Sequence, residues 1–317
     1  MAPIPVLIDT DPAISIFGAD VDDALAIVLA LNSEKLEIDG ITTVFGNTNV
    51  ENTYRIAKEL MKIANRQDIP VYKGAYNHTW LKVRSPAVQF LIEHIMEHPG
   101  EITLIALAPL TNIASAFLLE PRLAENLRSL LIMGGLFFPS RLQYPFIRSE
   151  FNFSSDGLAT KIVLDQDIDT TIIGLDVTSQ VCFSDVHYVA LQQAETSMAK
   201  FLAKHLKSWL ILNKILLGKG FYPHDPIAVA YLIKKSLFKM ITASLDVYVS
   251  KRKKSLPKFA HKRYSNSLPF VISHLLRKDG QLSVTIPPND SRKHKFKIGI
   301  SVNEKAFLKL LIKELTK

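Results

Sequence analysis

The chain has 317 residues, a formal net charge of +8 and a hydrophobic fraction of 48%. That length and apolar content are enough to bury a full core, and the single cysteine, Cys182, excludes an internal disulfide framework. No apolar run reaches the roughly 18 to 20 residues that span a bilayer, and no signal-like leader precedes the first predicted strand, so we expect a soluble, cytoplasmic protein without a membrane partner.

The excess positive charge is concentrated late in the chain, within residues 251–263. Such a stretch could bind nucleic acid, but no aromatic stacking pattern and no nucleic-acid module accompany it. Runs of charge most often lie on solvated surfaces. We therefore expect no nucleic-acid partner and interpret the stretch as an exposed loop or a subunit edge.

Two pairs of carboxylates stand close together near the start of the chain. Asp9 and Asp11 follow the first predicted strand, and Asp22 and Asp23 open the next predicted helix. Acids in the first turn suit the positive end of a helix dipole, which explains one or two of them but not the cluster. Close carboxylates repel one another unless protons or a cation lie between them, and calcium and magnesium prefer carboxylate oxygens. The cluster therefore predicts a metal site.

Apolar runs of strand length alternate with helical segments along the chain. Strands are predicted over residues 6–8, 38–44, 71–72, 102–106, 130–133, 170–174 and 297–302. Helices are predicted over residues 22–31, 50–64, 86–98, 112–119, 198–217, 227–233 and 304–315. This alternation predicts an α/β fold with an open, Rossmann-like, mostly parallel sheet and helices on both faces. No linker or repeat interrupts it, so we predict a single domain over residues 1–317.

Several polar residues and one methionine come at the ends of these predicted strands. They are Asp9, Asp11, Asn47, Met133 and Asp176. In open α/β sheets the ligand binds outside the carboxyl ends of the strands. We therefore expect these side chains to meet at one edge of the sheet and to form the functional site.

Six further motifs follow the two acid pairs. They are Gly46-Asn47, Pro109-Leu110-Thr111-Asn112, Met133-Gly134-Gly135, Glu150-Phe151-Asn152, Leu175-Asp176-Val177-Thr178 and His224-Asp225-Pro226. With Asp9-Thr10-Asp11-Pro12 and Asp22-Asp23-Ala24, their order resembles that of the inosine-uridine preferring nucleoside hydrolase family. The resemblance covers about residues 4–235. It implies a calcium-dependent enzyme that hydrolyses the bond between the ribose and the base of a ribonucleoside.

The resemblance also implies which residues hold the metal. Asp11, Asp23 and Asp225 are similar to the family's side-chain ligands of calcium, and Leu107 to the position that contributes a backbone carbonyl. Asp9 is similar to a neighbouring acid that supports the metal shell. Asp11 also resembles the general base, which takes a proton from the metal-bound water that attacks the sugar.

The remaining matches concern the substrate. The residues similar to the family's ribose-binding groups are Asp22, Asn47, Met133, Glu150 and Asn152. His224 is similar to the histidine beside the base, where it protonates or orients the leaving group. General chemistry agrees, because glycosidic cleavage develops positive charge on the sugar, which carboxylates and amide oxygens stabilise. Family members are commonly dimers or tetramers, so we expect a homodimer or homotetramer.

Three segments depart from the family's pattern, and all lie at the mouth of the predicted site. Residues 13–19 lengthen the loop between the two acid pairs, with Ala13 where the family has glycine. Residues 77–85 are shorter than the family segment that helps to cover the base. Residues 136–149 lack the family's Gly-Asn pair. The departures therefore concern specificity more than the floor of the site.

Two of these segments leave alternatives open. Trp80 could stack on a base, or it could simply pack or be exposed. Arg141 or Arg148 could favour an anionic 5′ group such as a phosphate, although arginines on loops more often face solvent.

Two other functions compete with the hydrolase. A strand followed by Asp9-Thr10-Asp11 also resembles magnesium-dependent haloacid-dehalogenase-type phosphatases, but those enzymes want threonine or valine where this chain has Ala13. A catalytically impaired, nucleoside-binding member of the hydrolase family would be expected to lose its metal ligands. Asp11, Asp23 and Asp225 are all present, which favours an enzyme.

Overall fold

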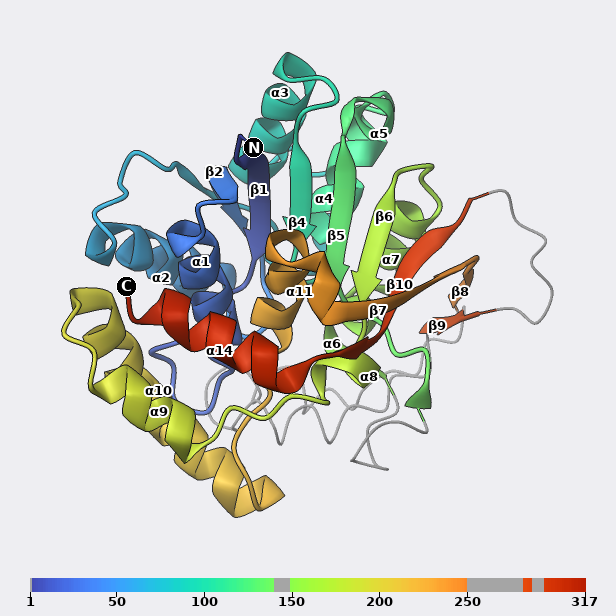
Figure 1. Ribbon diagram of the computed structural model, residues 1–317. Helices are drawn as coiled ribbons and strands as arrows, with labels where there is room; N and C mark the ends of the chain where they lie inside the picture. Colours follow the sequence, from blue (N-terminus) through green and yellow to red (C-terminus); the bar gives the residue numbers. More distant parts are fainter. Residues whose placement is uncertain (1, 140–148, 250–281, 287–293) are drawn as a thin grey trace, which may run out of the picture.

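The computed structural model describes residues 2–139, 149–249, 282–286 and 294–317 (Figure 1). An eight-stranded sheet runs through it in the order β3-β2-β1-β4-β5-β6-β10-β7. The strands are β1 (Ile4–Thr10), β2 (Leu36–Thr43), β3 (Val71–Lys73), β4 (Thr103–Ala106), β5 (Ser129–Met133), β6 (Thr170–Ile173), β7 (Phe238–Ala243) and β10 (Phe296–Val302). All neighbouring strands pair in parallel except β10 and β7, which are antiparallel. The predicted mostly parallel α/β sheet is confirmed.

Helices follow most of the strands, and others follow one another. The helices of the described residues are α1 (Asp22–Asn32), α2 (Val50–Ile63), α3 (Pro86–Glu97), α4 (Thr111–Leu119), α5 (Leu123–Asn126), α6 (Phe151–Ser155), α7 (Gly157–Leu164), α8 (Leu175–Thr178), α9 (Asp185–Gln192), α10 (Ser197–Leu217), α11 (His224–Ile233) and α14 (Glu304–Leu315), with short 3-10 turns η1 (His78–Trp80) and η3 (Lys235–Leu237). A small separate ribbon pairs β8 (Asp246–Val249) with β9 (Leu282–Thr285).

The two faces of the sheet bury two different apolar cores, as β1 illustrates. Val6, Leu7 and Ile8 are fully buried, which is the near-continuous apolar run expected of a parallel strand covered on both sides. Successive side chains of a strand point to opposite faces. Val6 and Ile8 accordingly join the core formed with α1, α2, α10, α11 and α14, and Leu7 joins the core formed with α3, α4 and α7. Helices therefore cover both faces, as predicted (Figure 1).

The register of the parallel strands brings their carboxyl ends to one edge. Asp9 of β1 lies opposite Thr42 of β2 and Ala106 of β4. The residues that follow these three strands must therefore leave the sheet side by side. In Figure 1, β5 and β6 point toward this edge, near α6 and α8.

The predicted strands and long helices agree with the observed ones to within a few residues, and α14 has the predicted bounds. The sequence did not predict β7, with its antiparallel pairing, or the β8–β9 ribbon. Arg141, Arg148 and the basic stretch 251–263 lie outside the described residues. Within the described ranges, no helix has both the length and the apolar character needed to cross a membrane.

Candidate active site

The floor of the site begins with the two acids at the end of β1. Asp9 is fully buried and Asp11 almost so. Asp9 Oδ1 accepts hydrogen bonds from Thr42 Oγ1 at 2.6 Å and Asn112 Nδ2 at 2.8 Å. Burial raises the pKa of Asp9 to about 7, although these two bonds lower it. Burial and then the charge of Asp23 raise the pKa of Asp11 well above its ordinary value.

Asp23, in the first turn of α1, is tied to the end of β1. Its Oδ1 accepts hydrogen bonds from Thr10 Oγ1 and, at 3.0 Å, from the backbone N–H of Asp11. Asp23 is fully buried, and burial raises its pKa despite these donors. The β1–α1 crossing therefore holds two acids against each other inside the protein.

Asp225 reaches the same place from the other end of the chain. It lies in the first turn of α11, and its backbone N–H donates to Asp22 Oδ2 at 3.1 Å. Burial and the charges of Asp22 and Asp23 raise the pKa of Asp225 well above its ordinary value. Contact between α1 and α11 thus joins acids that are about 200 positions apart in sequence.

Three of these acids could hold a metal ion together. Asp22, Asp23 and Asp225 each offer a carboxylate oxygen, and these oxygens lie within 4.8 Å of one another. All three are buried, so their mutual repulsion is poorly screened, and a bound cation would relieve it. An all-oxygen donor set is the chemistry that a hard divalent cation prefers. The residues therefore fit a metal site. This group contains Asp22, which was expected at the ribose, and it does not contain Asp11 or Asp9, which were expected at the metal.

Asn47 lies between Asp11 and Asp23. Its backbone N–H donates to Asp11 Oδ2 at 2.6 Å, and its side-chain amide donates to Asp23 Oδ2 at 2.8 Å. The turn that carries it requires glycine at position 46, because a Cβ there would lie 1.7 Å from Asp11 Oδ2. The Gly46-Asn47 turn is therefore built against the acid cluster, as its place after β2 predicted.

A second group of predicted residues meets beside the ends of β4 and β5. The side-chain amide of Asn152 donates to the backbone oxygens of Leu107 and Met133, at 3.0 and 3.1 Å. Glu150 caps α6 and accepts backbone N–H bonds from Gly135, at 3.0 Å, and from Asn152, at 2.6 Å. Burial raises the pKa of Glu150, while these backbone donors lower it. The polar groups predicted to hold the ribose therefore line this part of the edge.

His224 starts α11 directly before Asp225. Its Nδ1 is 2.7 Å from the hydroxyl of Thr178, which ends α8. This bond fixes the orientation of the imidazole ring at the edge of the sheet. The histidine therefore stands next to the acid group, directly before Asp225 in α11.

Comparison with known proteins shows the family to which the chain belongs. The model of the inosine-uridine preferring nucleoside hydrolase family matches residues 6–309. The chain belongs to this family. Its reaction is accordingly the hydrolysis of a nucleoside at the N-glycosidic bond. The membership predicted from the motifs is confirmed, and it removes the phosphatase alternative.

Curated relatives and solved structures agree with this assignment. A probable uridine nucleosidase 2 from Arabidopsis thaliana is 32% identical over 268 residues, which cover 74% of this chain and 78% of the relative. The inosine-uridine preferring nucleoside hydrolase of Leishmania major is 29% identical over 272 residues, which cover 77% of this chain and 83% of the relative. A solved plant nucleoside hydrolase has a TM-score of 0.79 at 24% identity, with 99% of each chain covered. The purine-preferring ribonucleoside hydrolase of Gardnerella vaginalis has a TM-score of 0.77 at 21% identity, with 98% of each chain covered. Both structures share the fold of this nucleoside hydrolase.

The first unusual segment of this family member, residues 13–19, forms a compact loop between the two acid pairs. The backbone N–H of Ile16 donates to Ala13 O at 2.8 Å, and Gly18 adopts a left-handed φ of 75° that suits glycine. Ile14 is buried in the core, whereas Phe17 is 81% exposed. The loop is therefore anchored at its base and presents one aromatic ring to solvent.

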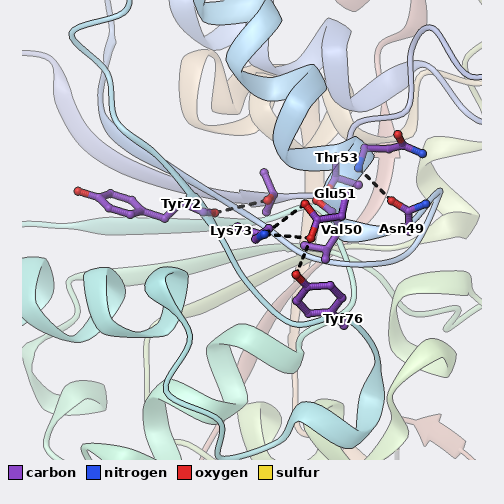
Figure 2. A network of polar contacts seen from close by, with 9 residues as sticks. Asn49, Val50, Glu51, Thr53, Tyr72, Lys73 and Tyr76 are labelled. Atoms are coloured by element: carbon purple, nitrogen blue, oxygen red, sulfur yellow. Dashed lines mark hydrogen bonds and ion pairs between the residues drawn. The ribbon is translucent and has the colours of Figure 1, made fainter.

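The second unusual segment, residues 77–85, continues from residues 74–76. The whole stretch 74–85 is fastened to the start of α2 through Tyr76. Figure 2 shows Glu51 between Lys73 and Tyr76. Lys73 Nζ donates to Glu51 Oε1 at 2.9 Å, and the Tyr76 hydroxyl donates to the same oxygen. Trp80 is partly buried against the small cluster of Val44, Ala75 and Ala108 and stands 4.6 Å, centroid to centroid, from the Tyr76 ring. The packed alternative for Trp80 is the one that the structure supports.

Several residues that position the floor carry no distinctive sequence signal. Thr42 and Thr10 are ordinary strand residues by pattern, yet each donates to an acid of the site. Asn112 and Thr178 stand in family motifs, but only the fold shows that they contact Asp9 and His224. A threonine between two aspartates at the carboxyl end of a strand is the pattern that could have indicated Thr10. Thr42 meets Asp9 only through the pairing of β1 with β2.

Proposed function

We propose that this nucleoside hydrolase uses calcium, held by Asp11, Asp23, Asp225 and the backbone carbonyl of Leu107, with Asp9 supporting the shell. The observation that carries the proposal is the buried group of Asp22, Asp23 and Asp225, whose oxygens lie within 4.8 Å of one another. Asp11 is adjacent to this group, which supports its proposed role: its backbone N–H donates to Asp23 Oδ1, and its Oδ2 accepts the backbone N–H of Asn47. Calcium rather than magnesium suits a site of several crowded carboxylates and a backbone oxygen, since calcium accepts more ligands and less regular geometry.

The reaction needs a nucleophile, a stabilised sugar cation and an activated leaving group. Bound calcium supplies the positive field that lowers the pKa of water toward neutrality. Asp11 accepts the proton of the attacking water as general base. Asp22 and Asn47 hold the ribose hydroxyls on one side of the sugar. Glu150 and Asn152 hold them on the other.

His224 is proposed to activate the leaving base. Its Nδ1 contact with Thr178 orients the ring. An imidazole titrates near neutral pH, so it can give a proton to a departing base and recover it from water. Met133, which ends β5, is proposed to pack near the sugar. Carboxylates around the ribose stabilise the positive charge that develops as the bond breaks.

The decisive experiment is a base-release assay with uridine, inosine and their 5′-monophosphates, with and without a calcium chelator. We expect base release from the nucleosides, loss of activity on chelation and recovery with calcium. Asp11→Asn should lose nearly all activity, and Asp185→Asn, which removes an exposed carboxylate paired with Lys214, should keep it. Wild-type activity in Asp11→Asn would contradict the assignment of Asp11 as general base and metal ligand. A strong preference for the nucleosides would sink the 5′-phosphate hypothesis attached to Arg141 and Arg148.

We further propose that residues 1–317 act as one domain and that the protein assembles into a homodimer or homotetramer. One sheet that includes strands from both ends of the chain supports the first proposal, because β10 pairs with β6 and β7. The family resemblance supports the second. Light scattering on the purified protein tests the assembly, and a strictly monomeric mass would contradict it.

A further inference from the structure

Asn112 is fully buried and has no assigned role in the reaction described above. It lies in the first turn of α4, beside the carboxyl end of the sheet. Its Nδ2 donates to Asp9 Oδ1 at 2.8 Å and to Thr43 O at 3.1 Å, and its Oδ1 accepts the backbone N–H of Ala75 at 2.9 Å. One amide therefore contacts β1, the end of β2 and the segment after β3.

The contact with Asp9 fixes an acid of the floor. Both donors to Asp9, Thr42 and Asn112, act on Oδ1. The other oxygen, Oδ2, is buried and has no hydrogen-bond partner among the described residues. The backbone oxygen of Asp9 accepts the N–H of Leu107 at 2.8 Å, so Asp9 is also joined to the proposed carbonyl ligand. Displacement of Asp9 would therefore disturb two parts of the proposed metal shell.

The contact with Ala75 fixes the start of the segment 74–85. Gly74 passes so close to Asn112 that a Cβ there would lie 2.3 Å from its Oδ1. Directly afterwards, Tyr76 is fastened from outside by Glu51 and Lys73 (Figure 2). The segment is thus held from inside by Asn112 and from outside by Glu51 of α2. Of these two residues, Asn112 is the one that also contacts an acid of the floor, Asp9.

We propose that Asn112 is a positioning residue, whose single amide keeps Asp9 and the rim segment 74–85 in one fixed relation. The inference rests on the proposed function, because it takes Asp9 as part of the metal shell and the segment as a border of the substrate site. Asparagine suits the task because its side chain carries both a donor and an acceptor on one planar group. An ionised aspartate has no donor, and an apolar residue would leave the buried Ala75 N–H unsatisfied.

The test compares Asn112→Ala with two variants. Thr42→Val removes the other donor to Asp9 and leaves the segment 74–85 untouched. Asn213→Ala removes a buried amide of α10 that donates to Trp209 O and serves as the matched control. Calcium affinity is measured by calorimetry on the metal-free protein. The kcat and KM are measured with the best nucleoside of the panel.

We expect Asn112→Ala to weaken calcium binding about 10- to 100-fold and to raise KM as well, because it releases both contacts. Thr42→Val should weaken calcium binding with little change in KM, and Asn213→Ala should change only the melting temperature. Equal calcium affinity in Asn112→Ala and Asn213→Ala would overturn the inference. Absence of base release and calcium binding in the wild type would instead overturn the proposed function.

A second variant keeps the inference testable if Asn112→Ala does not fold. Asn112→Asp has almost the same shape and retains an acceptor for the Ala75 N–H, but once its carboxyl group is ionised it has no donor for Asp9. We expect at least about a 10-fold lower kcat with KM within twofold of wild type. A rise in KM without a fall in kcat would show that Asn112 serves the segment alone and would overturn the proposed link.

Discussion

The floor and the rim of the site are built on different principles. The acids of the floor are buried, and hydrogen bonds across the ends of β1 and β2 and the starts of α1 and α11 hold them in place. The rim consists of loops that present exposed aromatic rings, with Phe17 81% and Tyr76 40% exposed. Sheet register fixes the first region, and local loop contacts fix the second. Chemistry should therefore be sensitive to substitutions in the floor, and substrate choice to substitutions in the rim.

The largest effect that separates floor from rim is expected from Asp225→Asn. The change removes a carboxylate from the proposed metal group, so kcat should fall at least about 10³-fold, as for other groups that act as a unit. Without metal, the variant should unfold at the same or a higher temperature, because it loses one of several crowded, buried carboxyl groups that must either repel one another or take up protons. Base release and thermal melting without calcium check both parts. A marked loss of metal-free stability would contradict the idea of a strained acid cluster.

The floor should also respond to pH in a direction that depends on calcium. Burial raises the pKa of Asp9 to about 7. It also raises the pKa of Asp20, a buried acid two positions before Asp22, to about 6. Between about pH 4 and pH 7 the metal-free folded protein then binds more protons than the unfolded chain, so its free energy of unfolding should fall as pH rises. Calcium requires deprotonated carboxylates, so saturating calcium should flatten or reverse this slope. Melting temperatures across this range, with and without calcium, provide the measurement.

Gly46→Ala tests how closely the floor is packed. Its new Cβ would lie 1.7 Å from Asp11 Oδ2, so Asp11 or the turn must move. We expect kcat to fall about 10- to 100-fold, together with weaker calcium binding. Calorimetry and steady-state kinetics on the same preparation would show it. Unchanged calcium affinity would mean that Asp11 can shift without cost and would weaken the view of a rigid floor.

Thr178→Val examines the boundary between the two regions. It removes the hydroxyl that contacts His224 Nδ1, and kcat for ordinary nucleosides should fall about tenfold because the ring loses its orientation. A riboside with a p-nitrophenyl leaving group needs no protonation, so its cleavage should change little. Thr178→Ser, which keeps the hydroxyl, is the matched control. Equal losses on both substrates would argue against a role in leaving-group activation.

The smallest effect is expected from the rim, in Phe17→Ala. The ring stands at the tip of an anchored loop, so its loss should raise KM about two- to threefold for some bases and leave kcat unchanged. Val186→Ala on α9, where an apolar side chain is 76% exposed, is the control for general surface effects. A large fall in kcat in Phe17→Ala would show that the loop shapes the floor and would break the division between the two regions.

The sequence predicted the acids of the floor far better than the residues that hold them in place. Asp9, Asp11 and Asn47 could be placed together because each follows an apolar strand, and parallel strands end at a common edge. Asp225 could be joined to them only through the family resemblance, since no local pattern reports a contact over about 200 positions. The structure also placed Asp22 among the possible metal-binding acids, whereas the resemblance implied a contact with ribose. These assignments remain proposals.

The parts that the sequence missed depend on tertiary contact. The antiparallel β7 completes the sheet beside β10 because strands distant in sequence meet there, which apolar periodicity does not report. The role of Asn112 is invisible in sequence because a buried amide and a helix-start asparagine look alike. The conformation of residues 13–19 likewise depends on Ile14 entering the core, and composition alone does not show it.

The contact between Asp22 and the N–H of Asp225 has a consequence for the lifetime of the folded state. The acid group is complete only after α11 has docked on α1, so the proposed calcium ion would bind the finished structure and would have no equivalent site in a partly folded chain. Calcium bound there should slow any opening that separates the two helices. The metal would then set how long the enzyme stays folded and protected from proteolysis, apart from its part in the reaction.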